Sequence, residues 1–180
     1  MPTKTLMTVG EFDALPPNEG IRYELLEGEL FMLASPMYYH QEICTRLIGK
    51  LIEYCRVHGG AVNHNTDFKL ANGSVLAPDV FYVSAENLAR INKHERNEGA
   101  PDLSIEVWSP SNTGDAEDLR RKAQVYLASG ARAVWLIYPE PRHGLFYKPG
   151  RPVEVRDDSQ SLDDPEVLPG FSVKLADILE

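Results

Sequence analysis

The most regular hydrophobic pattern in the chain predicts a long helix over residues 38–58. Its apolar side chains recur three or four residues apart, as they do on one face of an α-helix, and Gly59 and Gly60 end the pattern. These side chains are Ile43, Leu47, Ile48, Leu51, Ile52 and Cys55. A second amphipathic pattern predicts a helix over residues 115–129, which Gly130 ends.

Elsewhere the pattern changes to short runs of alternating, β-branched and aromatic residues, which predict strands. The predicted strands are residues 22–33, as a hairpin that turns at Glu27-Gly28, and then residues 62–70, 75–83, 102–108, 133–138 and 144–148. Short helices are expected over residues 8–15 and 84–92, and residues 171–179 are expected to pack back on the body. This order of elements indicates an α/β fold with a mixed central sheet flanked by helices, formed as one domain by residues 1–180.

The composition is ordinary for a globular protein and narrows the classes of function. No apolar run approaches the roughly 20 residues of a membrane helix, and the first residues lack a secretion signal. The formal net charge of −9 argues against a protein that coats nucleic acid through a broad basic surface. It still permits a nuclease whose basic groups are local and whose carboxylates are neutralised by metal ions.

The two cysteines, Cys44 and Cys55, lie on the predicted long helix. Three helical turns separate them by roughly 16 Å, which is too far for a disulfide. We expect packing thiols in a protein of the reducing cytoplasm. A zinc site formed by Cys55, His58 and His64 is the weaker alternative, because no fourth ligand is evident.

Two predicted strands each carry one carboxylate in an otherwise apolar context. Asp79 follows Pro78 at the start of an apolar run, and Glu106 alternates with Leu103, Ile105 and Val107. A carboxylate buried in a strand needs a partner for its charge, and a hard divalent cation such as Mg²⁺ is one such partner. Taken singly, Glu106 could instead face solvent and Asp79 could be a turn residue.

Lys122 is the cation that these carboxylates could meet. On the predicted helix over residues 115–129 it lies at the edge of the apolar stripe, about 40° from Tyr126. A lysine in this position can lay its stem on apolar surface and extend its ammonium towards the end of a strand. The alternative is an ion pair with Asp118, one helical turn earlier.

Together these residues resemble the PD-(D/E)xK nuclease superfamily, and more closely the Uma family, which was catalogued as candidate restriction endonucleases. The matching segments are residues 23–30 (YELLEGEL), His40, 78–80 (PDV), 83–86 (VSAE), 100–111 (APDLSIEVWSPS), Lys122 with Tyr126, Gly130, 135–137 (WLI), Pro139 and 168–171 (LPGF). They span nearly the whole chain in the expected order.

The resemblance implies a restriction-endonuclease-like core with an N-terminal β-hairpin extension and a Mg²⁺ site at Asp79 and Glu106, which Mn²⁺ could also fill. One position departs from the superfamily pattern, because Trp108 stands where the lysine usually follows the glutamate. The resemblance therefore assigns the lysine role to Lys122. Glu24 would add a further carboxylate to the metal site, or else form an ion pair with Arg22 within the hairpin.

The function implied is Mg²⁺-dependent hydrolysis of phosphodiester bonds, with DNA as the expected substrate and a homodimer as the expected assembly. His40 would lie at the rim of the cleft or cap the long helix. The alternative function is a catalytically inactive nuclease-fold module that binds nucleic acid or protein as an accessory subunit. Signatures of other chemistries, such as Cys-x-x-Cys, Gly-x-Ser-x-Gly and His-Glu-x-x-His, are not present in the sequence.

Overall fold

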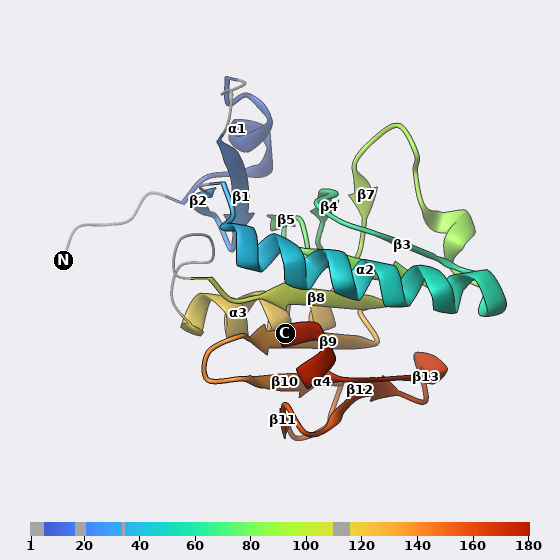
Figure 1. Cartoon of the computed structure of the whole chain (residues 1–180). Coiled ribbons are helices and arrows are strands. Elements are labelled where there is room, and N and C mark those ends of the chain that lie inside the picture. The colour runs from blue at the N-terminus through green and yellow to red at the C-terminus, as the bar shows by residue number, and fades with distance from the viewer. Residues whose placement is uncertain (1–5, 17–20, 34, 110–115) are drawn as a thin grey trace.

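A six-stranded mixed sheet forms the centre of the structure (Figure 1). The computed structural model describes residues 6–16, 21–33, 35–109 and 116–180. In spatial order the strands are β11 (Glu154–Asp157), β10 (His143–Tyr147), β9 (Ala133–Tyr138), β8 (Leu103–Val107), β6 (Val80–Val83) and β3 (Ala61–Asn63). Strands β8 and β9 are parallel and the other neighbours are antiparallel, which confirms the predicted mixed sheet.

The predicted N-terminal hairpin belongs to a second sheet. Its strands, in spatial order, are β2 (Glu29–Leu33), β1 (Arg22–Leu26), β5 (Val75–Leu76), β4 (Phe68–Lys69) and β7 (Asn97–Glu98). The turn between β1 and β2 uses Glu27 and Gly28, with φ of 52° and 83°. Positive φ at both positions suits the tight turn of a two-residue hairpin, as the sequence predicts.

Helices cover both faces of the central sheet. The long helix α2 (Tyr38–His58) has the predicted bounds and crosses the front of the sheet in Figure 1, where α4 (Leu175–Leu179) packs beside it. Helix α3 (Ala116–Ala128) covers the opposite face, so alternate residues of β8 and β9 enter two separate cores. The short α1 (Val9–Asp13) is capped by Thr8 and Glu11, as expected.

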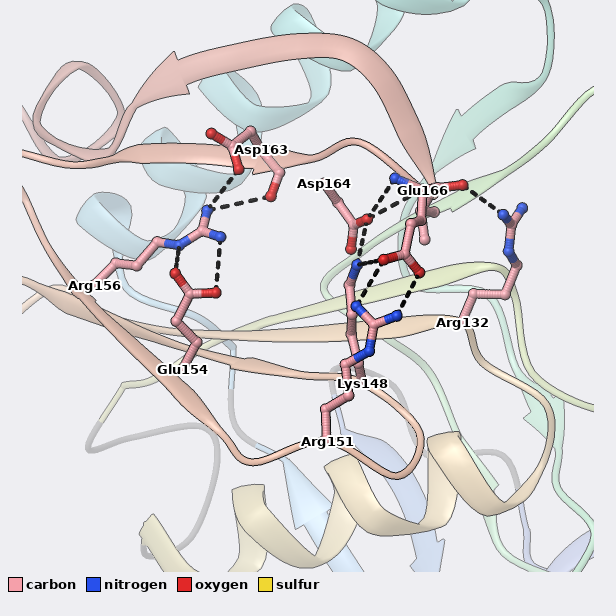
Figure 2. Close-up of polar contacts among 9 residues, drawn as sticks. Arg132, Lys148, Arg151, Glu154, Arg156, Asp163, Asp164 and Glu166 are labelled. Atoms are coloured by element: carbon pink, nitrogen blue, oxygen red, sulfur yellow. Dashed lines mark hydrogen bonds and ion pairs between the residues drawn. The ribbon is translucent and has the colours of Figure 1, made fainter.

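A third, two-stranded sheet of β12 (Ser161–Asp164) and β13 (Leu168–Lys174) is joined to the central sheet by paired charges (Figure 2). Arg156 binds Glu154 at 2.7 Å and Asp163 at 3.0 Å. Lys148 lies 2.8 Å from the buried Asp164. Each of these cations has a carboxylate partner, so these ion pairs hold the third sheet against the central sheet.

Two predicted strands are each divided. The segment 62–70 gives β3 and β4, because Asn65 adopts a left-handed conformation (φ 48°) and its N–H bonds to the Pro78 carbonyl at 3.0 Å. The segment 75–83 gives β5 and β6, separated by Pro78, which has no N–H for a sheet. The chain thereby passes from one sheet to the other beside Asp79.

The predicted helix over residues 84–92 is wrong. Only Leu88–Arg90 form one 3₁₀ turn, because Asp102 accepts hydrogen bonds from the Ser84 N–H at 2.8 Å and the Asn87 amide at 2.6 Å. Strands β7, β11, β12 and β13 were not predicted, and Asp115, the expected start of α3, lies outside the described residues. No helix within the described ranges is both long enough and apolar enough to span a bilayer.

Helix α2 offers a matched test of how its buried face contributes to stability. Leu51 is fully buried and its neighbour Ile52 is 40% exposed. We expect Leu51→Ala to lower the free energy of unfolding by about 2–5 kcal/mol, because it leaves a cavity between α2 and the sheet. Ile52→Ala should cost less than about 1 kcal/mol. Urea denaturation measures both, and equal losses would contradict the packing described.

Candidate active site

The register of the central sheet brings Asp79 and Glu106 together. Val80 of β6 lies opposite Ile105 of β8 in an antiparallel pair, and continuing this register puts Asp79 opposite Glu106. Opposite residues share one face of a sheet and have neighbouring side chains. Asp79 also accepts a hydrogen bond from the Val107 N–H at 2.9 Å, so its carboxylate is fixed to the strand that carries Glu106.

Glu106 is buried on the face covered by α3, with 1% of its surface exposed. Its Oε1 accepts a hydrogen bond from the Tyr126 hydroxyl at 2.9 Å and lies 3.9 Å from Lys122 Nζ. Burial raises the pKa of Glu106 to about 8; Lys122 opposes the rise, and the charges of Asp79 and Glu24 add to it. The sequence did not assign Tyr126 to the site, although its position one turn after Lys122 is a usable signal.

Lys122 extends into the site instead of pairing with Asp118, the alternative partner predicted from the sequence. Asp118 pairs instead with Arg121 at 3.0 Å. Lys122, 3% exposed, lies 2.5 Å from Glu24 Oε2, although the angles there are outside those of a hydrogen bond. Burial alone would lower the pKa of Lys122, but the charges of Glu106 and Glu24 raise it above its ordinary value. The ammonium is therefore held charged between two strands.

Glu24 of β1 connects the second sheet to the site. Its Oε1 accepts a hydrogen bond from the Ala77 N–H at 3.2 Å and lies 3.9 Å from the Arg22 guanidinium. The contact with Arg22 that was predicted as one alternative for Glu24 is thus present, and a second contact joins Glu24 to Lys122. The shorter contact, to Lys122, indicates that Glu24 chiefly positions the ammonium.

His40 is neither a helix cap nor an exposed residue of the rim. It is buried in the first turn of α2, and its Nε2 lies 3.1 Å from Asp79 Oδ2. The other ring nitrogen, Nδ1, lies 3.8 Å from the thiol of Cys44. Burial raises the pKa of Asp79, but the hydrogen bonds from His40 and Val107 outweigh it and hold the pKa below its ordinary value. Asp79 is therefore ionised, with Oδ2 engaged by two donors.

A pocket of about 420 Å³ reaches this cluster from the side of α2. Asp79 and His40 line it, whereas Glu24, Glu106 and Lys122 are nearly inaccessible behind them. Trp108, in the usual lysine position, packs beside Tyr138 with ring centroids 6.4 Å apart. Of the described acidic residues in this cluster, Asp79 is the one that lines the pocket.

The donor set fits a hard divalent cation. Three buried carboxyl groups face one ammonium, and a divalent cation would offset the charge that they carry when ionised. The hydrogen bonds described here engage Asp79 Oδ2 and Glu106 Oε1, and carboxylate oxygens are the ligands Mg²⁺ prefers. No cluster of three or more His, Cys, Asp or Glu with metal-site geometry occurs among the described residues. A cation here would thus take one or two carboxylates and several waters.

The weaker zinc alternative gains no support from the described residues. His58 stacks on Tyr54 with ring centroids 4.3 Å apart, and His64 bonds to the side chain of Asn65. Cys44 and Cys55 are both free, as predicted. None of these contacts resembles a tetrahedral metal site.

The buried position of Lys122 predicts a large loss of stability when its charge is removed. Lys122→Met leaves the Glu24 and Glu106 carboxylates without their cation, and we expect the free energy of unfolding to fall by about 3–5 kcal/mol. Lys69→Met is the matched control, because Lys69 forms an exposed pair with Glu98 at 3.2 Å and should cost at most about 1 kcal/mol. Similar losses in urea denaturation would contradict the buried ion pair.

The protonation of Glu106 predicts that metal-free protein becomes less stable as pH rises. Its pKa is about 8 in the folded chain against an ordinary 4.5, so between these values the folded state holds a proton that the unfolded chain has released. The stabilisation is complete below the lower value and is lost as pH rises through the upper one. In EDTA, wild type should lose more unfolding free energy over this window than Glu106→Gln. Parallel pH profiles would refute the assignment.

Comparisons with known proteins identify the family and the fold of this chain. A family model described as Uma2, putative restriction endonuclease, matches residues 9–176. A crystal structure described as a putative nuclease belonging to DUF820, from Anabaena variabilis, superimposes with a TM-score of 0.83 at 20% identity, covering 96% of this chain and 97% of that chain. No curated protein matches the sequence. At this identity the structural likeness establishes a common fold, and the family match extends over nearly all of the chain. The chain therefore belongs to the Uma2 family of putative restriction endonucleases and has the fold of a nuclease.

Proposed function

We propose that this protein is a Mg²⁺-dependent endonuclease that hydrolyses phosphodiester bonds of DNA. The observation that carries the proposal is the meeting of Lys122 with the carboxylates of Glu24 and Glu106, next to Asp79 at the inner end of a pocket. Burying such a group of charges costs stability. Carboxylates with perturbed pKa values beside a pocket are typical of active sites.

Asp79 and Glu106 would hold the metal, which when bound polarises the scissile phosphate and lowers the pKa of a water ligand. Asp79 is suited to this role because the contacts with His40 and Val107 fix one of its oxygens and so orient the carboxylate. The Tyr126 hydroxyl similarly fixes one oxygen of Glu106. These contacts orient the carboxylates before any ligand arrives.

Lys122 would stabilise the negative charge that develops on the phosphate during hydrolysis, or orient the attacking water. Its ammonium is charged and is held by Glu24 at 2.5 Å. A donor that is already in position when charge develops contributes more than a mobile one. Glu24 is a positioning residue in this account. Cutting both strands of a duplex benefits from two such sites, so the proposal includes a homodimer. Light scattering would measure the mass of this assembly.

Cleavage of plasmid DNA and of single-stranded DNA and RNA, with Mg²⁺ and with EDTA, tests the proposal. We expect cutting only with the metal, and a loss of about 10²–10³-fold in Glu106→Gln and in Lys122→Met, since each removes a group that acts on the scissile phosphate. Lys69→Met serves as the folded control that keeps wild-type activity.

Three results would count against the proposal. Cutting in EDTA would exclude the metal, and cutting unaffected by both substitutions would exclude these residues. A wild type that binds nucleic acid without cutting any substrate would favour the accessory module. Cleavage confined to RNA would retain the mechanism and change the substrate.

A further inference from the structure

The pocket that leads to Asp79 is rich in hydrogen-bond donors. Side chains that can donate line it from three segments of the chain: Arg22 from β1, Ser35, Gln41 and Thr45 near the start of α2, and His64 and Asn65 after β3. Asp79 is the only carboxylate among its described lining residues. The chain as a whole is acidic, with a net charge of −9, whereas this pocket wall is rich in donors and is therefore suited to binding an anion.

Arg22 is the main cation of the pocket, and its guanidinium is held on two sides. One terminal nitrogen donates to Asn65 Oδ1, and the other lies 3.9 Å from Glu24 Oε1. A guanidinium has five N–H donors in a planar fork, so these contacts leave donors for a ligand. The side chain is one third exposed, at 33%, and can therefore be reached from the pocket.

Asn65 also fixes the orientation of His64. Its Oδ1 accepts from Arg22, so its amide nitrogen is the donor in the 3.1 Å contact with His64 Nδ1. When Nδ1 accepts, the proton of a neutral imidazole is on Nε2. His64 therefore carries a second N–H donor beside the arginine. The Asn65 N–H bonds to the Pro78 carbonyl at 3.0 Å, which ties this pair to the residue before Asp79.

The ion pairs between the β10–β11 hairpin and the β12–β13 hairpin provide a contrast (Figure 2). They border another pocket, of about 250 Å³, in which Lys148, Arg151 and Arg156 each lie within 3.0 Å of a carboxylate oxygen. Those cations are neutralised by their partners. Among the described carboxylates, the ion-pair contact of Arg22 is with Glu24 at 3.9 Å, and Glu24 is itself paired more closely with Lys122.

We propose that Arg22, supported by Asn65 and His64, binds a phosphate group of a polynucleotide next to the scissile one. This inference rests on the proposed function for the nature of the anion. The pocket volume of about 420 Å³ is within the range of small-ligand sites, so a nucleotide unit can enter it. The planar guanidinium of Arg22 can donate to two oxygens of one phosphate, and the bound polynucleotide would then continue towards Asp79.

Binding of a fluorescent single-stranded oligonucleotide in EDTA, where the proposed reaction cannot proceed, tests the inference separately from catalysis. Arg22→Gln should weaken binding about tenfold and reduce the slope of log K against log salt by about one phosphate contact. Arg22→Lys should restore the slope and only part of the affinity, because it keeps the charge and loses the fork. Arg56→Gln, an exposed arginine at the far end of α2, is the control and should bind as wild type.

Thermal melting of each variant establishes that it is folded. Unchanged affinity and slope in Arg22→Gln, or no binding by wild type, would overturn the inference. Oligonucleotides with a 5′-hydroxyl and a 5′-phosphate separate the two sources of the phosphate, since an effect in both indicates an internal phosphate and an effect only in the latter indicates a terminal one. Arg22-dependent binding by a wild type that fails to cut with Mg²⁺ would reject the proposed function and keep the phosphate site.

Discussion

The contact between the Lys122 ammonium and the carboxylates around it is the interaction on which the rest of the site depends. Glu24 comes from the second sheet, Glu106 from the central sheet and Lys122 from the helix that covers it. Each charge alone would be unfavourable at this depth. Together they hold three elements in a fixed relation, and with Asp79 they place three carboxyl groups around one ammonium, a donor set suited to a hard cation.

A second set of contacts surrounds this centre and orients its carboxylates. His40 reaches Asp79 from α2, Tyr126 reaches Glu106 from α3, and the Asn65 backbone joins the loop after β3 to Pro78. The site is therefore assembled where both sheets and both long helices meet. The ion pairs between the β10–β11 hairpin and the β12–β13 hairpin use the same kinds of residue, but each cation there lies close to a carboxylate partner, so their contribution is to hold elements together.

The sequence predicted the elements whose signals are local. The period of α2 and the glycines after it gave its bounds, and the alternation in β8 showed which side Glu106 would face. Local signals failed where a distant residue decides the structure. Asp102 binds the segment that begins at Ser84 and prevents a helix, and Asn65 and Pro78 divide two strands between sheets.

The sequence proposed members of the candidate site but could not predict their contacts. The motifs singled out Asp79, Glu106, Lys122 and Glu24, but a spacing of 98 residues between Glu24 and Lys122 contains no information on distance. The contact of His40 with Asp79 joins residues 39 apart, and nothing in either segment indicated it. Only the register of β6 against β8, and the packing of the helices, brings these side chains together.

The central claim is that Asp79 and Glu106 bind a hard cation beside Lys122. Titration calorimetry with Mn²⁺ on wild type, Asp79→Asn and Lys69→Met measures this directly, without any assumption about the substrate. The account predicts saturable binding in wild type and in Lys69→Met, and a large loss of affinity in Asp79→Asn. Equal affinity in all three proteins would contradict it.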